Sequence, residues 1–411
     1  MNPSKRRQPP AGSPPLGIFS GRPAFAEMRH VGRPNIGNRE RFLARLNDIL
    51  DKRWLTNRGE YVIELEKRIA GLIGVRNCIL VCNGTVGLEL LIRALGLRGE
   101  VIVPAFTFVA TAHALQWQEI TPVFADIDPA THCLDPASVE SMITPRTSGI
   151  IGVHVWGRPC APRELAKLAA RHNLKLAFDA AHAFGCFYDG RMIGSCGEAE
   201  VFSFHATKLV NTFEGGAIVT NNDRLAEQLR LMQNFGFAGY DQVVYLGTNG
   251  KMSEVCAAMG LTNLESMDEL IECNRSNYLA YQQQLAGIPG MRLSAHDGRH
   301  RSNYHYVVAT VDEDSLLSRD ELMEVLHAEN IIARRYFFPG VHRMEPYRST
   351  FSRAHLLLPR TEQLCRQVLV LPTGTSVSEA DIARICEVIR TALDHAAPVR
   401  KRLAEIRIAA S

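Results

Sequence analysis

The sequence Phe202-Ser-Phe-His-Ala-Thr-Lys208, continued by Leu-Val-Asn-Thr-Phe-Glu-Gly-Gly216, places one lysine between two strand-like runs. The first run covers residues 199–204, and the second, at 217–220, begins directly after the Gly-Gly pair. Because Gly-Gly is a strong turn signal, the chain is expected to reverse direction around Lys208. We therefore expect the ammonium group of Lys208 to lie inside the fold, although most lysines stay in solvent.

A carboxylate occurs upstream, in Leu174-Lys-Leu-Ala-Phe-Asp179-Ala-Ala-His182-Ala-Phe-Gly185. Asp179 ends an apolar run and is followed by small residues, as at the carboxyl end of a buried strand. In open α/β folds, that edge of a parallel sheet is where ligands bind. A carboxylate buried there needs a cationic or hydrogen-bonding partner.

Lys208 and Asp179 are the pair of groups that pyridoxal phosphate enzymes require. The lysine amine holds the cofactor aldehyde as a Schiff base, and the carboxylate keeps the pyridine nitrogen protonated so that the ring accepts electrons. About one strand, one turn and a second strand separate the two residues, so both can face one pocket. A salt bridge between neighbouring strands remains the alternative for the same pair.

Two motifs around these residues resemble those of the DegT/DnrJ/EryC1/StrS family of sugar aminotransferases. Phe178-Asp-Ala-Ala-His-Ala-Phe-Gly185 is similar to the family's aspartate motif, and Ser203-Phe-His-Ala-Thr-Lys208 with Glu214-Gly-Gly216 is similar to its lysine motif. The resemblance extends from about residue 33 to residue 372. It implies a fold-type I enzyme of the α/β class, with a large, mostly parallel sheet domain covered by helices and a smaller C-terminal α+β domain.

Length and composition limit the class of protein. With 411 residues, of which 46% are hydrophobic and 22% charged, the chain can bury a large core and most simply forms two domains. We expect a disordered leader at 1–30, a large cofactor-binding domain at 31–255 and a small domain at 256–411. The formal charge of +3 is small and the basic residues are dispersed, which argues against nucleic-acid binding.

The cysteines and apolar runs indicate the compartment. Ten cysteines occur without a Cys-x-x-Cys pair, which favours reduced thiols and a cytoplasmic protein. The N-terminal residues lack the apolar core of a signal peptide, and no run is apolar enough to span a bilayer. We therefore expect neither a membrane partner nor a metal site.

A turn suited to a phosphate follows the strand-like run at 78–82. Asn83-Gly84-Thr85 opens a helix, whose N-terminal amides and dipole favour an anion. A plain helix cap is the alternative for such a tripeptide. The resemblance assigns Gly84, Thr85 and Ser203 to the cofactor phosphate.

The resemblance also implies further cofactor contacts. Phe108 would lie against the cofactor ring and His182 would hydrogen-bond the ring hydroxyl, whereas on local grounds they could be a core aromatic and a helix-capping histidine. Asn249 would reach the phosphate of the neighbouring subunit's cofactor, which implies a homodimer with shared active sites. Family members often have Ser-Arg after this asparagine, but this chain has Gly250-Lys251.

Two neighbouring residues have no assigned role. Arg334 and Arg335 stand in Arg334-Arg-Tyr-Phe-Phe-Pro339, which resembles the family segment that closes over substrate. They could steady an acidic ligand such as a nucleotide diphosphate, or they could form a solvated charged turn. His205, three positions before the lysine, is left outside the catalytic set.

The resemblance implies transamination, since relatives that dehydrate their substrate carry histidine in place of Lys208. We expect glutamate as amino donor and a nucleotide-linked 4-keto-6-deoxyhexose, most simply dTDP-4-keto-6-deoxyglucose, as acceptor. The motifs look like those of C4-aminating enzymes. Amination at C3, a cyclitol or amino-acid ketone as substrate, and a non-catalytic regulator that keeps the fold stay open as alternatives.

Overall fold

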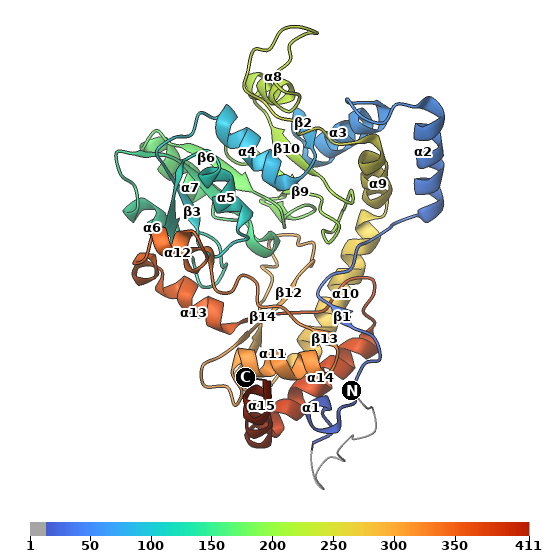
Figure 1. Ribbon diagram of the computed structural model, residues 1–411, viewed down its shortest axis with the longest axis vertical. Helices are drawn as coiled ribbons and strands as arrows, with labels where there is room; N and C mark the ends of the chain where they lie inside the picture. The colour runs from blue at the N-terminus through green and yellow to red at the C-terminus, as the bar shows by residue number, and fades with distance from the viewer. Residues whose placement is uncertain (1–13, 411) are drawn as a thin grey trace.

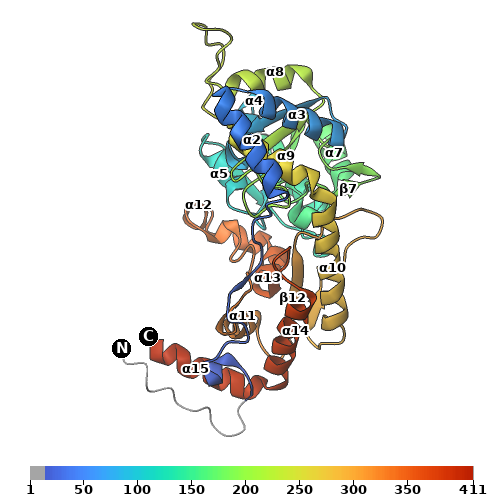
Figure 2. The same ribbon diagram turned by 90° about the vertical axis from the view of Figure 1, so that its right-hand side faces the viewer.

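Residues 14–410 are described by the computed structural model and form two packed units joined by the long helix α10 (Met267–Leu285). Figure 1 shows the larger unit above the smaller one, and Figure 2 shows α10 passing between them. No helix within 14–410 combines the length and apolar character needed to cross a bilayer.

The larger unit contains a seven-stranded sheet in the order β2-β10-β9-β6-β5-β3-β4. The strands are β2 (Asn77–Val81), β3 (Glu100–Pro104), β4 (Thr121–Ala125), β5 (Thr147–Val153), β6 (Lys175–Asp179), β9 (Ala199–Ser203) and β10 (Gly216–Thr220). Neighbours are parallel except that β10 runs antiparallel to both β2 and β9. The predicted mostly parallel sheet is therefore confirmed.

Helices cover both faces of this sheet. They are α3 (Glu60–Ile73), α4 (Gly84–Ala94), α5 (Ala110–Gln116), α6 (Pro136–Ser141), α7 (Pro162–Arg171), α8 (Asp223–Met232) and α9 (Glu254–Glu265). Ile79 and Val81 pack beneath α4, α5 and α8, whereas Leu80 between them packs beneath α3 and α9. Strands buried on both sides need this near-continuous apolar sequence.

Two further elements lie outside this layered core. α2 (Arg39–Lys52) packs on α9 at the outer edge (Figure 1), and β7 (Phe187–Tyr188) forms a small hairpin with β8 (Arg191–Met192).

The smaller unit has an antiparallel sheet in the order β11-β12-β14, as an α+β domain predicts. Its elements are β11 (Met291–Leu293), β12 (Val307–Val311), α11 (Arg319–Ala328), β13 (Ile331–Ile332), α13 (Pro359–Gln367), β14 (Val368–Leu371), α14 (Glu379–Asp394) and α15 (Ala396–Ala410). The short helix α12 (Tyr347–Thr350) lies between β13 and α13 in the chain, but its Tyr347 is buried in the core of the large sheet. Capping boxes at Ser318 and Ser378 fix the starts of α11 and α14.

The predicted disordered leader is wrong for residues 14–30, while residues 1–13 lie outside the described part. Leu16 and Phe25 are buried in the core of the smaller unit, next to the short helix α1 (Gly17–Ser20). β1 (Arg29–His30) pairs in parallel with β13. The Glu329 carboxylate accepts hydrogen bonds from the backbone N–H groups of Gly17 and Ala24. Glu329 lies some 300 residues from Gly17 and Ala24 in the sequence. The local composition of the N-terminal segment, on which the prediction of disorder was based, contains no sign of such a distant partner.

The change from one core to the other falls within α10, later than the predicted boundary after residue 255. Ala257 and Leu261 of α9, and Ile271 of α10, belong to the core beneath α3. Tyr281 and Leu285, further along α10, belong to the core of the smaller unit. A continuous helix shared by two cores carries no break in the sequence that would mark this boundary.

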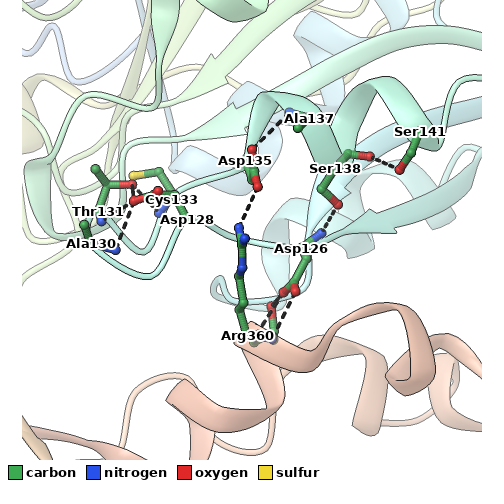
Figure 3. A network of polar contacts seen from close by, with 11 residues as sticks. Asp126, Asp128, Ala130, Thr131, Cys133, Asp135, Ala137, Ser138, Ser141 and Arg360 are labelled. Atoms are coloured by element: carbon green, nitrogen blue, oxygen red, sulfur yellow. Dashed lines mark hydrogen bonds and ion pairs between the residues drawn. The ribbon is translucent and has the colours of Figure 1, made fainter.

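A polar contact ties α13 back to the large sheet (Figure 3). Asp126, directly after β4, accepts hydrogen bonds from Arg360 N at 3.0 Å, Thr361 N at 2.9 Å and Thr361 Oγ1 at 2.8 Å. The residue preceding α13, Leu358, has no capping side chain. The Asp126 carboxylate therefore satisfies the free N–H groups at the start of this helix and opposes its dipole.

Replacing this carboxylate is expected to destabilise the protein. Asp126→Ala leaves three donors at a buried site without an acceptor, so we expect the free energy of unfolding to fall by about 2–3 kcal/mol in urea titrations. The control is Asp314→Ala, because Asp314 is exposed and has no side-chain partner within residues 14–410. That change is expected to stay within about 0.5 kcal/mol. Equal effects of the two substitutions would contradict the capping role.

Candidate active site

A cavity of about 530 Å³ opens at the carboxyl ends of β6 and β9. Seven of the eight predicted site residues line it: Gly84, Thr85, Phe108, Asp179, His182, Ser203 and Lys208. The eighth, Asn249, is exposed elsewhere. The parallel register fixes part of this arrangement, since Asp179 stands opposite Val201 on the neighbouring strand.

Lys208 occupies a tight turn beyond β9. Its backbone N–H donates to His205 O at 2.8 Å. Side-chain amides hold the next residues, because Asn35 Nδ2 donates to Leu209 O at 3.0 Å and Asn211 Nδ2 donates to Asn35 O at 2.6 Å. Hydrogen bonds therefore fix the backbone both at Lys208 and in the residues that follow it.

The amine of Lys208 is half-buried and has one close polar contact. Nζ lies 3.4 Å from Tyr306 Oη, and no ion pair joins it to a carboxylate of the described chain. Burial lowers the pKa of Lys208 to about 8, although the charge of Asp179 acts in the opposite direction. An amine with this pKa is partly neutral near physiological pH and can act as nucleophile or base.

Asp179 is buried at the end of β6. Thr111 Oγ1 donates to Oδ2 at 2.8 Å, and the backbone N–H of Ala181 donates to Oδ1 at 3.0 Å. Burial raises the pKa of Asp179, and these two hydrogen bonds act against that shift. One donor on each oxygen leaves acceptor capacity on a buried carboxylate, and a cationic group in the cavity would fill it.

The start of α4 forms an anion cradle at the same cavity. Asn83 accepts a hydrogen bond from Val86 N at 2.8 Å, so the helix-cap alternative is also correct. The N–H groups of Gly84 and Thr85 have no acceptor within residues 14–410. A Cβ on Gly216 would come within 2.9 Å of Gly84 N, so the Gly-Gly turn leaves room beside these amides. Such a helix start suits a phosphate.

Phe108 and His182 flank the space between these groups. The Phe108 side chain lines the cavity yet is 60% exposed, so little protein covers its ring. His182 Nδ1 accepts a hydrogen bond from Trp156 N at 3.3 Å, which places the ring proton on Nε2. Burial holds the pKa of His182 well below its usual value, so the ring is a neutral donor.

This set of groups fits pyridoxal 5′-phosphate. A nucleophilic amine, a buried carboxylate with acceptor capacity, unpartnered helix amides and an uncovered aromatic ring meet in one cavity. The salt-bridge alternative is wrong, because Lys208 and Asp179 are not paired within the described chain. A phosphorylated pyridine aldehyde supplies complementary groups for all four features.

The segment 334–339 was singled out from the sequence, but Tyr336 was assigned no role in the cavity, and the other residues that the smaller unit contributes were not identified. His305, Tyr306 and Tyr336 line the cavity, and His305 Nε2 lies 2.9 Å from Thr207 O, beside the lysine. Thr111, the donor to Asp179, was also missed. An aromatic cluster in residues 304–306 was the available signal, but such a cluster is equally typical of a strand in a separate domain.

Asn249 stands on an arm formed by residues 235–249, which projects from the top of Figure 1 next to α8. Asn234 and Asn249 form an isolated antiparallel bridge at the base of the arm. The arm exposes several large apolar side chains: Phe235, Phe237, Tyr240, Val243, Val244, Tyr245 and Leu246. The arm therefore exposes an apolar surface that the rest of its own chain does not cover.

Comparison with known proteins identifies close relatives. The model of the DegT/DnrJ/EryC1/StrS aminotransferase family matches residues 37–390. A dTDP-4-amino-4,6-dideoxy-D-glucose transaminase of Shigella dysenteriae is 39% identical over 360 residues, covering 88% of this chain and 98% of that protein. A GDP-perosamine synthase of Caulobacter vibrioides is 35% identical over 365 residues, covering 86% and 95%. The crystal structure of DesI in the presence of its TDP-sugar product is 50% identical with a TM-score of 0.89, covering 95% and 98%.

The lowered pKa of Lys208 can be measured on cofactor-free protein. We expect competitive labelling with acetic anhydride, read by peptide mass spectrometry, to titrate Lys208 near pH 8, well below the ordinary value of about 10.4. Because the Asp179 charge favours the ammonium form, Asp179→Asn should move the midpoint lower still. A midpoint near the ordinary value, or one that rises in the variant, would contradict the electrostatics described above.

Proposed function

The chain belongs to the DegT/DnrJ/EryC1/StrS aminotransferase family, and from this membership we propose that it aminates a nucleotide sugar. The amino group passes from glutamate to C4 of a nucleotide-linked 4-keto-6-deoxyhexose, most simply dTDP-4-keto-6-deoxy-D-glucose. Pyridoxal 5′-phosphate is the cofactor. The observation that carries the proposal is the meeting of Lys208 and Asp179, unpaired, in one cavity.

Each cavity residue has a position suited to one part of the cofactor. The Lys208 amine would attach it covalently, and Asp179 would hold the pyridine nitrogen. The amides of Gly84 and Thr85, with the Ser203 hydroxyl, would bind the phosphate. The last contacts are with the ring itself: His182 would donate from Nε2 to the hydroxyl, and Phe108 would stack on the face.

When bound, the cofactor supplies an electron sink that accepts the electron pair of a broken C–H bond. Once the amine of glutamate has replaced Lys208 on the cofactor, the free Nζ of Lys208 would be the base that removes the proton from Cα of glutamate. The same group would protonate C4 of the sugar in the second half-reaction. A pKa of about 8 suits both directions, since the amine gives and takes the proton near neutral pH. Tyr306 Oη, 3.4 Å away, holds the amine in place between the two transfers.

The choice of C4 over C3 is supported by two observations. The lysine motif looks like that of C4-aminating enzymes, and a relative at 39% identity is named dTDP-4-amino-4,6-dideoxy-D-glucose transaminase, a name that places the amino group at C4. The name of the Shigella relative contains dTDP, whereas that of the Caulobacter relative contains GDP. We propose the thymidine nucleotide from the first of these.

We also propose a cytoplasmic homodimer with shared active sites. All ten cysteines are free, as a reducing compartment requires. The arm at 235–249 exposes apolar side chains that a second copy would cover. Asn249, on that arm, would contact the cofactor phosphate in the partner's cavity.

One reaction tests the proposed chemistry. Purified protein is incubated with pyridoxal phosphate, dTDP-4-keto-6-deoxyglucose and glutamate, and NMR locates the new nitrogen, which we expect at C4. Lys208→Ala should abolish turnover, and Asp179→Ala should reduce it by more than about 100-fold because the electron sink loses its charge. Nitrogen at C3 would instead assign the chain as a C3 aminotransferase. Product formed only from a cyclitol ketone or a keto acid would assign it to that class of substrate. Absence of a visible cofactor band with wild-type protein would favour the non-catalytic regulator.

Mixed dimers test the shared site. Lys208→Ala and Asn249→Ala chains, each inactive or impaired alone, should give one intact site when co-expressed with different tags, and hence about half the activity per mixed dimer. The matched control combines Lys208→Ala with Asp179→Ala, because both residues belong to the same chain's site and no intact site forms. Rescue in both mixtures, or in neither, would contradict a contribution of Asn249 across subunits.

A further inference from the structure

Two segments form the outer rim of the cavity. β1 and β13 run parallel, with Arg29 opposite Ile331 and His30 opposite Ile332. The residues that follow each strand reach the cavity together: Val31 and Gly32 from one segment, and Tyr336 and Phe337 from the other. Arg334 and Arg335 lie immediately before this second pair.

Arg335 is committed to a structural contact. Its Nη1 lies 2.8 Å from Asp320 Oδ1, and its Cζ stands 4.1 Å from the centre of the Phe338 ring. The buried Arg319 shares the same carboxylate at 2.8 Å and also donates to Val368 O at 2.7 Å. Two guanidinium groups on one carboxylate leave an excess of positive charge behind the rim.

Arg334 has a fixed backbone but no acidic partner. Its N–H donates to Val370 O at 3.0 Å, and its carbonyl accepts from Val370 N at 2.7 Å, which anchors it to β14. The side chain is exposed, and Cζ stacks 4.9 Å from the centre of the Tyr336 ring. No carboxylate within residues 14–410 forms an ion pair with it.

Two other arginines near the cavity already have partners, and one histidine that lines it is uncharged. Arg29 pairs with Asp381 at 3.2 Å, and Arg33 donates to Met28 O at 3.4 Å. Burial lowers the pKa of His305 to about 4, so this ring is neutral. Among the rim residues described here, Arg334 is therefore the cation best placed for an anionic ligand.

The cavity volume determines where that anion lies. About 530 Å³ is in the lower half of the range of about 300–1,000 Å³ that encloses a single small ligand. Under the proposed function, the cofactor and the reacting sugar would fill this space, so the nucleotide would extend across the rim. The diphosphate, which links the sugar to the nucleoside, would then pass the ring of Tyr336, which lines the cavity, and the Arg334 guanidinium stacked on that ring.

We propose that Arg334 binds the diphosphate of the nucleotide-sugar substrate, while Arg335 only maintains the segment that carries it; this rests on the proposed function. The planar guanidinium can donate two parallel hydrogen bonds to phosphate oxygens. Stacking on Tyr336 holds it in position, so less conformational entropy is lost on binding. The two adjacent arginines thus have different roles.

Binding of dTDP to the cofactor-loaded protein tests the assignment by isothermal titration calorimetry. Arg334→Gln should weaken dTDP binding by about tenfold or more, since a charge-assisted contact is lost. Arg335→Gln is the matched control and should change it by less than about threefold. Thymidine, which lacks the diphosphate, should bind wild type and Arg334→Gln alike, and added salt should reduce the difference between them for dTDP.

Steady-state kinetics give a second readout. Arg334→Gln should raise KM for the nucleotide sugar about tenfold and leave KM for glutamate unchanged, with Arg334→Lys in between. Unchanged dTDP affinity, equal losses for dTDP and thymidine, or failure of wild type to bind dTDP, GDP or UDP would overturn this assignment. Normal dTDP binding without an amino-sugar product would overturn the proposed reaction instead.

Discussion

The structure depends on holding a carboxylate and an amine in one cavity without pairing them. Burial raises the pKa of Asp179 and lowers that of Lys208 to about 8, so both groups are pushed toward their neutral forms. The chain compensates only in part, through Thr111 and Ala181 on one side and Tyr306 on the other. A ligand with a cationic ring nitrogen at one end and an aldehyde at the other would satisfy both groups, so the fold is prepared for a cofactor.

The sheet provides this separation. β6 and β9 are parallel neighbours, and both deliver polar groups at their carboxyl ends. β10 is the exception in direction, and its antiparallel course returns Gly216 to the start of α4, where a side chain would collide with Gly84 N. One chain reversal therefore produces both the turn that carries Lys208 and the turn that leaves the backbone N–H groups of Gly84 and Thr85 uncovered.

Local chemistry could be predicted from the sequence, but contacts between distant segments could not. Asp179 was placed correctly at a strand end because an apolar run followed by small residues is typical of a buried strand that stops at the sheet edge. The disorder predicted for residues 14–30 was wrong, since the acceptor for the backbone N–H of Gly17 is the Glu329 carboxylate, far away in the sequence. Tyr306 was missed for the same reason, because only the docking of the smaller unit brings it beside Lys208.

The residues that line the cavity come from two different units of the fold. This division suggests how related enzymes can share a reaction yet act on different substrates. Asp179 and Lys208 belong to the large sheet, whereas Tyr306 and Tyr336 belong to the smaller unit. The N-terminal rim also belongs with the smaller unit, because β1 pairs with β13 and Arg29 pairs with Asp381 of α14. Under the proposed function, changes in these outer segments would alter which nucleotide or sugar is bound, while the positions of Asp179 and Lys208 in the larger unit would stay unchanged. The residues proposed for catalysis and those proposed for substrate selection thus come from different units, which are held together by α10, by a shared core that includes Phe178 and Val370, and by the cavity itself.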